Sequence, residues 1–281
     1  WELEEAKLRR MPPEKELAGK VALITGAAGG IGSATANKFL KEGCCVILTD
    51  IDSKALQQTK KSFQNKFGTD VVKSIVMDVT KENDVKKAVD ESVNKFGGID
   101  ILVANAGFAS AAPFDKTSSK LWDKNMAVLS KGCFLISREV YSQMMRQNIG
   151  GSIIFISSKN SLSASKGASA YSVAKSSLLH LSRSIALEGA EHKIRSNIIN
   201  PDAVIQNSRI WSGDWKKQRA AGNNIPINKV EEFYKNRSLL KVSVLPEDIA
   251  EGIYFFASSK SKKSTGNIIN IDGGNITSFT R

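Results

Sequence analysis

Short apolar segments alternate with longer amphipathic segments along most of the chain. In these apolar segments, polar and apolar residues do not alternate as they do in strands that face water on one side. The segments are VALIT (21–25), CVILTD (45–50), VKSIVM (72–77), IDILVANAG (99–107), GSIIFISS (151–158), IRSNIIN (194–200) and NIINIDGG (267–274). Strands that are covered on both faces have this pattern. Because strands that alternate with helices form a parallel sheet, the pattern predicts one α/β domain, doubly wound and built in three layers.

Two segments fall outside this alternation. Residues 1–18 are dense in charge and contain two adjacent prolines, which predicts an arm or short helix before a main domain of residues 19–281. Residues from about 205 to 240 form a long insertion between the last two strands, with Trp211, Trp215 and a helical pattern in KVEEFYKNRSLLK. An insertion of this length is typical of a lid over a site.

Composition narrows the class of protein and its partners. The 281 residues are 41% hydrophobic and 24% charged, which is typical of a soluble globular domain. No apolar run approaches the roughly 18 residues that a membrane span needs, and the charged start does not resemble a signal peptide, so we expect a cytoplasmic protein. The net charge of +12 would suit nucleic acid, but the cations are scattered and form no basic block with aromatics. We expect a solvated cationic surface instead.

The cysteines and histidines give no metal or disulfide pattern. Cys44, Cys45 and Cys133 lie in apolar stretches without metal-ligand spacing, and an odd number of cysteines provides no disulfide framework. His180 and His192 are too few and too far apart for a metal site. We interpret the cysteines as reduced core residues.

A glycine-rich turn follows the first apolar segment, in VALITGAAGGIG. Gly26, Gly30 and Gly32 stand between a predicted strand and a predicted helix, where glycines let the backbone turn tightly and let a pyrophosphate approach the helix N-terminus. Glycines alone also make ordinary tight turns, but their order here favours a dinucleotide site.

Asp50 ends the second predicted strand, where an acidic side chain can accept hydrogen bonds from the adenosine ribose hydroxyls. A 2′-phosphate about 4 Å away would meet a like charge at a cost on the order of 1 to 4 kcal/mol. No arginine adjoins Asp50 in the sequence, so the position favours NAD over NADP. Asp52 nearby is interpreted as a turn-forming aspartate.

Tyr171 and Lys175 lie four residues apart in YSVAK, within a predicted helix rich in small residues. Residues at that spacing share a helix face, which allows proton-transfer chemistry but equally describes two surface residues one turn apart. The spacing alone is a weak signal, since lysine is common in this chain.

The motifs together resemble the short-chain dehydrogenase/reductase family over about residues 18–275. They are TGAAGGIG, MDVT with Asp78, NAG at 105–107, ISS ending in Ser158, YSVAK and TGNIINIDGG. Their common order is much more specific than any one of them. The resemblance implies a Rossmann-like, seven-stranded sheet, a nicotinamide cofactor and a homo-oligomer, either a dimer or a tetramer.

The resemblance also implies roles for single residues. Tyr171 would be the acid/base, Lys175 its partner and a ligand of the nicotinamide ribose, and Ser158 the group that holds the substrate oxygen. An ammonium about 4 Å from the phenol would lower the pKa of Tyr171 towards neutrality, since such a pair is worth about 4 kcal/mol at an effective dielectric near 20. The other cofactor contacts would be Ile31, Ile51, Asp78, Val79, Asn105, Ala106, Gly107, Pro201 and Val204.

Two positions depart from the family's pattern. Leu129 stands where the family has an active-site asparagine that serves a proton relay, and Asn125, one turn earlier, is not an evident substitute. Asp202 replaces the glycine that follows Pro201, which would set a carboxylate close to the nicotinamide or the substrate.

Longer stretches, among them LWDKNMAVLSKGCFL and LLKVSVLPEDIAE, resemble the dehydrogenase domain of bifunctional rhamnulose-1-phosphate aldolase/lactaldehyde dehydrogenase proteins. The resemblance implies rhamnose catabolism, an aldolase domain before this one, and NAD-dependent hydride transfer with lactaldehyde. A polyol, sugar phosphate or other secondary alcohol is an alternative substrate, and a redox-silent NAD-binding module is a further alternative. Candidate substrate contacts are Lys159, Asn160, Asp202 and Trp211. An alternative interpretation is that Lys159 and Asn160 are ordinary surface residues and that Trp211 packs in the core.

Overall fold

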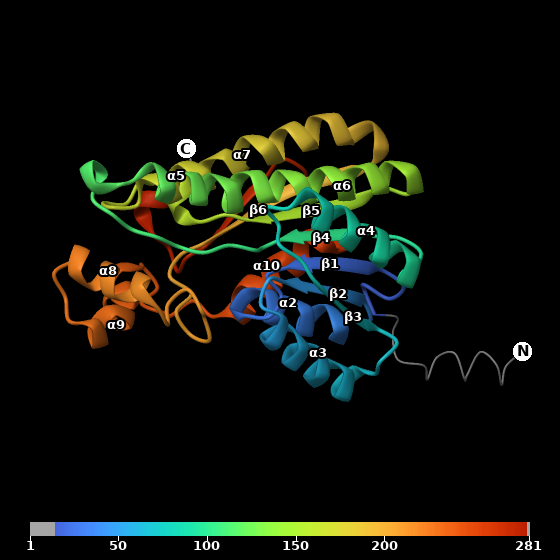
Figure 1. Cartoon of the computed structure of the whole chain (residues 1–281), viewed down its shortest axis with the longest axis horizontal. Helices are drawn as coiled ribbons and strands as arrows, with labels where there is room; N and C mark the ends of the chain where they lie inside the picture. Colours follow the sequence, from blue (N-terminus) through green and yellow to red (C-terminus); the bar gives the residue numbers. More distant parts are fainter. Residues whose placement is uncertain (1–14, 280–281) are drawn as a thin grey trace, which may run out of the picture.

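The computed structural model describes residues 15–279 and contains one sheet of seven strands. Helices lie on both sides of this sheet (Figure 1). All neighbouring strands are parallel, in the order β3-β2-β1-β4-β5-β6-β7. This Rossmann-like arrangement confirms the predicted fold. The strands are β1 (Val21–Thr25), β2 (Cys45–Asp50), β3 (Val72–Val76), β4 (Ile101–Ala104), β5 (Gly151–Ile156), β6 (Ile194–Pro201) and β7 (Ile268–Ile271).

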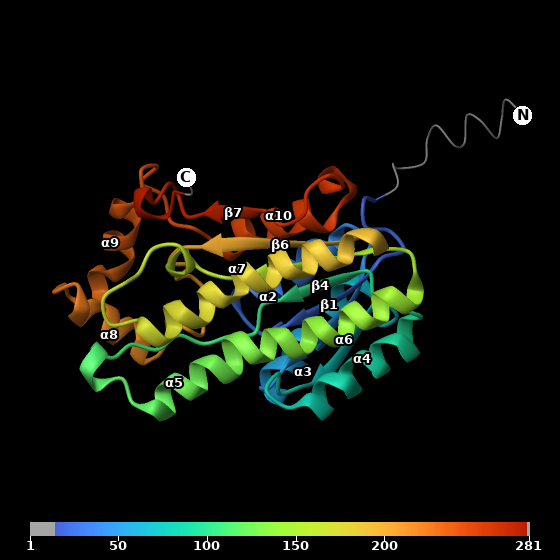
Figure 2. The same cartoon turned by 90° about the horizontal axis from the view of Figure 1, so that it is seen from above.

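Helices cover both faces of the sheet and complete three layers (Figure 2). One face carries α2 (Gly30–Lys41), α3 (Ser53–Phe67) and α10 (Pro246–Ala257), and the other carries α4 (Glu82–Phe96), α6 (Gly132–Gln147) and α7 (Ser169–Gly189). The central strands are buried on both faces, which is why their sequences are apolar without alternation. Cys44 and Cys133 lie in these two cores as predicted, and Cys45 is half-buried.

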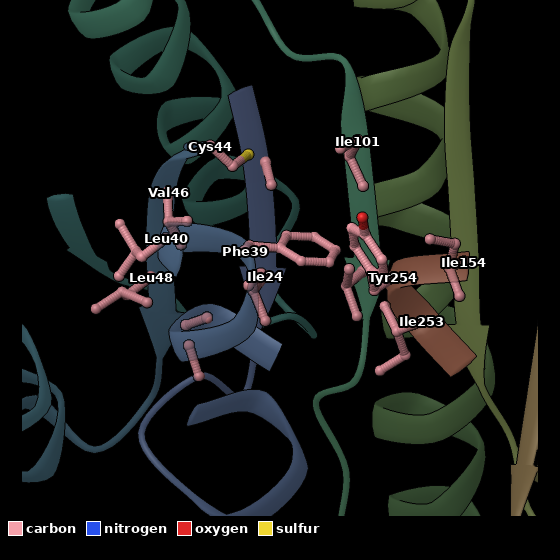
Figure 3. Packing of buried hydrophobic residues seen from close by; sticks show 14 of the residues in the cluster. Ile24, Phe39, Leu40, Cys44, Val46, Leu48, Ile101, Ile154, Ile253 and Tyr254 are labelled. Atoms are coloured by element: carbon pink, nitrogen blue, oxygen red, sulfur yellow. The ribbon is translucent and has the colours of Figure 1, made fainter. Parts of the chain in front are cut away.

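The core beneath α2 fixes the helix that follows the glycine-rich turn. Phe39 of α2 is fully buried and lies between Ile24 of β1 and Tyr254 of α10 (Figure 3). On the helix surface, Lys38 Nζ bridges Glu42 and Glu251 at 3.0 Å each, which ties α2 to α10. The N-terminus of α2 is therefore held in a constant position relative to the end of β1.

A π-helical turn joins α5 (Ser119–Asn125) to α6 without a break in the helix. This turn, η2, spans Met126–Lys131 and contains Leu129, which is fully buried. Single π turns inside α-helices are rare and frequent at functional sites, because they turn side chains away from the regular helical positions. The sequence did not predict the π turn.

The two segments outside the alternation have different outcomes. Most of the predicted arm, residues 1–14, lies outside the described residues; of the rest, Leu17 is buried in the core and its N–H donates to Glu42 O at 3.1 Å. The insertion forms two short helices, α8 (Asp214–Gly222) and α9 (Val230–Arg237), beside the carboxyl ends of the strands (Figure 1). In residues 15–279, no helix is long and apolar enough to cross a membrane.

Candidate active site

A cavity of about 850 Å³ lies at the carboxyl ends of the strands, between the sheet and the α8–α9 segment. All but one of the predicted site residues line this cavity, from the glycine-rich turn to the segment that contains Trp211. The exception is Gly32, which lies beneath the turn. The structure thus brings the predicted cofactor residues and the predicted Ser158, Tyr171 and Lys175 to one continuous surface.

The glycine-rich turn is too closely packed for side chains. Gly26 has φ +64°, and a Cβ on it would lie 2.9 Å from Ala106 Cα; a Cβ on Gly32 would lie 2.3 Å from Gly26 O. Asn105 holds the turn from the next strand, since its Nδ2 donates to Thr25 O at 2.9 Å and to Gly26 O at 3.1 Å. The backbone is thereby exposed to the cavity at the N-terminus of α2, where its free N–H groups suit a pyrophosphate.

Asp50 is buried at the end of β2 and accepts hydrogen bonds from Ala28 N at 3.1 Å and from Asp52 N at 3.0 Å. Asp52 accepts from Ala55 N at 3.0 Å and caps α3, which agrees with its interpretation as a local structural residue. The carboxylate of Asp50 therefore has a fixed position on the cavity wall, where ribose hydroxyls can reach it.

Arg209 of the insertion lies directly against Asp50. Its Nη2 is 2.7 Å from Asp50 Oδ2, its Nη1 is 3.1 Å from Asp52 Oδ2, and a Cβ on Gly29 would lie 2.8 Å from its Nε. The prediction of NAD preference rested partly on the absence of an arginine beside Asp50, and in space that premise is wrong. Arg209 lies 159 residues after Asp50 in the sequence. No local sequence pattern could therefore reveal that the two residues form an ion pair.

Ser158, Tyr171 and Lys175 come from two neighbouring elements. Ser158 follows β5 and caps the short helix η3 (Lys159–Ser161), its Oγ accepting from Asn160 N at 3.2 Å. Tyr171 lies in the first turn of α7, and Lys175 lies one turn later with its Nζ donating to Ile156 O at 2.7 Å. The two side chains share one helix face, as the spacing predicted, and both line the cavity.

The pKa of Tyr171 is shifted in the opposite direction from the one expected beside Lys175. Burial raises the pKa of Tyr171 above its ordinary value, the Ser158 hydroxyl opposes this through a hydrogen bond, and the Asp202 carboxylate raises it further. Burial also lowers the pKa of Lys175. The expected lowering of the tyrosine pKa by Lys175 is therefore wrong for this arrangement, in which the ammonium is bonded to a backbone carbonyl and burial dominates.

Both departures from the family's pattern have a structural outcome. Leu129 lies in the π turn, and a Cβ on Gly107 would lie 3.0 Å from its Cδ2, so an apolar side chain fills this position. Asn125 is fully buried, and its Nδ2 donates to Leu121 O at 2.8 Å and to Ser110 Oγ at 2.9 Å. Asn125 does not line the cavity, as expected of a residue that is no substitute for the family's asparagine.

Asp202 lies on the cavity wall, but its charge is compensated. Its Oδ2 is ion-paired with Arg237 of α9 and accepts from Asn275 Nδ2 at 2.9 Å. The expected carboxylate therefore lies on the cavity wall as an ion pair, and its partner comes from the insertion.

The insertion contributes an aromatic wall that the sequence revealed only in part. Trp211 packs edge-on against Trp215 and Tyr234, with ring centroids 6.1 Å and 5.2 Å apart. Trp215, and not Trp211, stands next to Tyr171, at 5.8 Å between ring centroids. Arg219 lies one helical turn after Trp215, a spacing in the sequence that indicates a shared helix face.

Comparison with known proteins finds similarity over nearly the whole chain. A family model described as enoyl-(acyl carrier protein) reductase matches residues 26–275. The uncharacterized oxidoreductase YuxG of Bacillus subtilis (strain 168) is 50% identical over all 281 residues, and the chain spans 41% of that protein's length. The 3-oxoacyl-(acyl-carrier-protein) reductase FabG of Thermotoga maritima is 34% identical, over 92% of this chain and 98% of its own. A crystal structure of a short-chain type dehydrogenase/reductase from Mycobacterium marinum matches with a TM-score of 0.80 at 27% identity, over 93% of this chain and 97% of that one.

We expect the Tyr171 phenol to titrate above the ordinary tyrosine range, because burial and Asp202 both disfavour the phenolate. The difference in phenolate absorbance between the unaltered protein and Tyr171→Phe isolates this group. Asp202→Asn should move its midpoint down, since it removes the neighbouring negative charge. A titration midpoint of Tyr171 at or below the ordinary pKa of tyrosine would show that burial does not dominate the pKa of this group.

Proposed function

Because the chain belongs to the short-chain dehydrogenase/reductase family, whose oxidoreductases use NAD or NADP, we propose that it transfers a hydride between NAD and a small hydroxyaldehyde or alcohol, lactaldehyde being the first candidate. One observation carries this proposal. Ser158, Tyr171 and Lys175 line the same cavity as the glycine-rich turn that can receive a pyrophosphate.

The residues of the cavity divide the chemistry among them. In the oxidising direction the phenolate form of Tyr171 would take the proton of the substrate hydroxyl, while hydride leaves the carbon that bears this hydroxyl and that carbon becomes a carbonyl. In the reducing direction the neutral phenol, the form that burial favours, would give its proton to the carbonyl oxygen. Ser158 holds the substrate oxygen beside the phenol. Lys175 has three donors, so it can keep its bond to Ile156 O and still donate to a ribose hydroxyl. A bound nicotinamide would accept the hydride.

The cofactor contacts follow from the same surface. The glycine turn would bind the pyrophosphate, and Asp50 with Ile51 would bind the adenosine ribose. Asp78 and Val79 would contact the adenine, and Asn105, Ala106 and Gly107 would lie on the adenosine ribose side. Pro201 and Val204 would lie at the nicotinamide half. Asp78 already accepts from Thr80 N at 2.9 Å, so its side chain is fixed on the cavity wall.

Lactaldehyde is proposed on the resemblance of long stretches to the dehydrogenase domain of the bifunctional aldolase/dehydrogenase proteins. The similarity to a relative more than twice as long as this chain is consistent with an additional domain, for which we propose an aldolase. Oxidation would proceed through the hydrated aldehyde, whose gem-diol hydroxyl faces Tyr171 as an alcohol would. A three-carbon substrate provides little binding energy, so the tryptophans of the insertion would serve to exclude water.

Two alternatives remain distinguishable by experiment. A sugar phosphate is favoured over a neutral polyol by Lys159 and Arg219, two buried cations on the cavity wall. A redox-silent NAD-binding module is favoured by the apolar Leu129 at the family's relay position. We also propose a homo-oligomer, because α6 and α7 expose Phe134, Val173 and Leu187. The cytoplasmic location is proposed on the composition of the sequence alone.

We expect Tyr171→Phe to lower kcat by about a hundredfold to ten-thousandfold while NAD still binds, because the variant loses only the proton-transfer oxygen. Lys175→Ala should weaken both turnover and NAD binding. Tyr141→Phe is the matched control, since Tyr141 lies on α6 away from the cavity. Steady-state kinetics and NAD titration measure both effects, and a Tyr171→Phe variant that keeps more than a few per cent of activity would rule out the proton-transfer role.

We expect a higher kcat/KM with NAD than with NADP. Asp50→Ala should reduce the ratio of kcat/KM with NAD to kcat/KM with NADP, because it removes the carboxylate that repels the 2′-phosphate of NADP. Arg209→Ala should raise this ratio by about tenfold, because it removes the only cation bonded to that carboxylate in residues 15–279. Arg183→Ala, on the exposed surface of α7, is the matched control. Equal efficiency with the two cofactors in the unaltered protein would refute NAD preference.

We expect the protein to form NADH from NAD and L-lactaldehyde and to release lactate, identified by chromatography, with Tyr171→Phe as the inactive control. Turnover of polyols or sugar phosphates in place of lactaldehyde would move the assignment to the alternative substrates. No turnover across the panel, with NAD bound, would support the silent module instead.

A further inference from the structure

Lys159 is a buried cation whose surroundings supply no carboxylate at ion-pair distance. The residue is 6% exposed, and its Nζ donates to Ser165 Oγ at 2.9 Å, which in turn donates to Asn160 Oδ1 at 2.9 Å. No carboxylate oxygen of the described residues lies within 4.0 Å of this ammonium. Two of its three donors thus remain available on the cavity wall.

Arg219 is a second such cation, on α8. It is 7% exposed, its Nε donates to Tyr234 Oη at 3.1 Å, and its Nη1 donates to Lys166 O at 3.0 Å. Its Nη2 has no partner in residues 15–279, and its guanidinium stands over the Trp215 ring at 5.3 Å. The side chain is therefore held rigidly, with donors left over at the cavity.

The charges nearby do not balance. Asp202 is the one carboxylate that raises the pKa of Lys159, and it is already paired with Arg237 and bonded to Asn275. Burial, Arg237 and Arg219 all lower the pKa of Lys159. Buried charges are costly unless they are paired, so two buried cations without a carboxylate partner on the wall of one cavity indicate that a binding partner supplies the anion.

We propose that Lys159 and Arg219 form an anion subsite that binds a carboxylate or phosphate of the substrate or product. This inference rests on the proposed oxidoreductase function and names the ligand chemistry of the same cavity. Lys159 directly follows Ser158, and Trp215 contacts both Tyr171 and Arg219, so the anion lies next to the reacting carbon. The carboxylate of lactate as product, or the phosphate of a phosphorylated hydroxy compound, has the required chemistry.

Fluorescence of the protein tests the subsite without any turnover, because Trp215 lies under Arg219. L-lactate, inorganic phosphate and the neutral 1,2-propanediol are titrated in the presence of NAD on a Tyr171→Phe background, which prevents oxidation of the diol, at constant ionic strength set with chloride. We expect Lys159→Met to weaken binding of the anion by about tenfold to a hundredfold, the loss expected for a charge-assisted hydrogen bond, and to leave 1,2-propanediol unchanged. Lys159→Arg should restore most of the anion affinity.

Lys166→Met is the matched control, since Lys166 is an exposed lysine of the same loop whose side chain does not line the cavity. If Lys159→Met weakens the binding of lactate alone, the ligand is a product carboxylate. If it weakens the binding of phosphate alone, the ligand is phosphorylated. The subsite is refuted if neither anion binds more tightly than 1,2-propanediol, or if Lys159→Met affects all three alike. Anion binding without any hydride transfer would instead refute the proposed function and leave the subsite intact.

Discussion

The common direction of all seven strands is the constraint on which the site depends. Because every strand is parallel to its neighbours, all their carboxyl ends meet at one edge of the sheet. Asp50 ends β2, and Gly26, Asn105 and Ser158 follow β1, β4 and β5, so the four residues meet there. Close packing then fixes their positions, above all at Gly32, where a Cβ would lie 2.3 Å from Gly26 O. A rigid sheet edge is a suitable place for chemistry that needs reacting atoms within a few tenths of an ångström.

The insertion of residues 205–240, which contains α8 and α9, completes the cavity. Its side chains line both ends of the cavity. Arg209 reaches the Asp50 end, whereas Trp215, Arg219 and Arg237 face the end beside Tyr171. One segment therefore touches both the cofactor-binding surface and the substrate space. Movement of this segment would change both together, which links the entry of the dinucleotide to the shape of the substrate pocket.

The sequence predicts the fold well because burial on both sheet faces leaves uninterrupted apolar strands. It also predicts the glycine turn and the shared face of Tyr171 and Lys175, since both are set by neighbours within a few residues. It fails where distant segments meet. Arg209 contacts Asp50 directly although it lies 159 residues later in the sequence. The pKa of Tyr171 depends on burial by the insertion, which spacing does not encode. The sequence does not distinguish Trp215 from Trp211 as the neighbour of Tyr171, because that choice depends on how α8 packs against the cavity.

The central claim is that a nicotinamide dinucleotide occupies this cavity with its reactive ring beside Tyr171. A crystal structure of the protein with NAD tests it most directly. We expect the pyrophosphate on the glycine-rich turn, the adenosine ribose on Asp50, the nicotinamide ribose on Lys175, and space beside the ring that faces Lys159. A dinucleotide bound with its nicotinamide away from Tyr171, or outside the cavity, would contradict the claim.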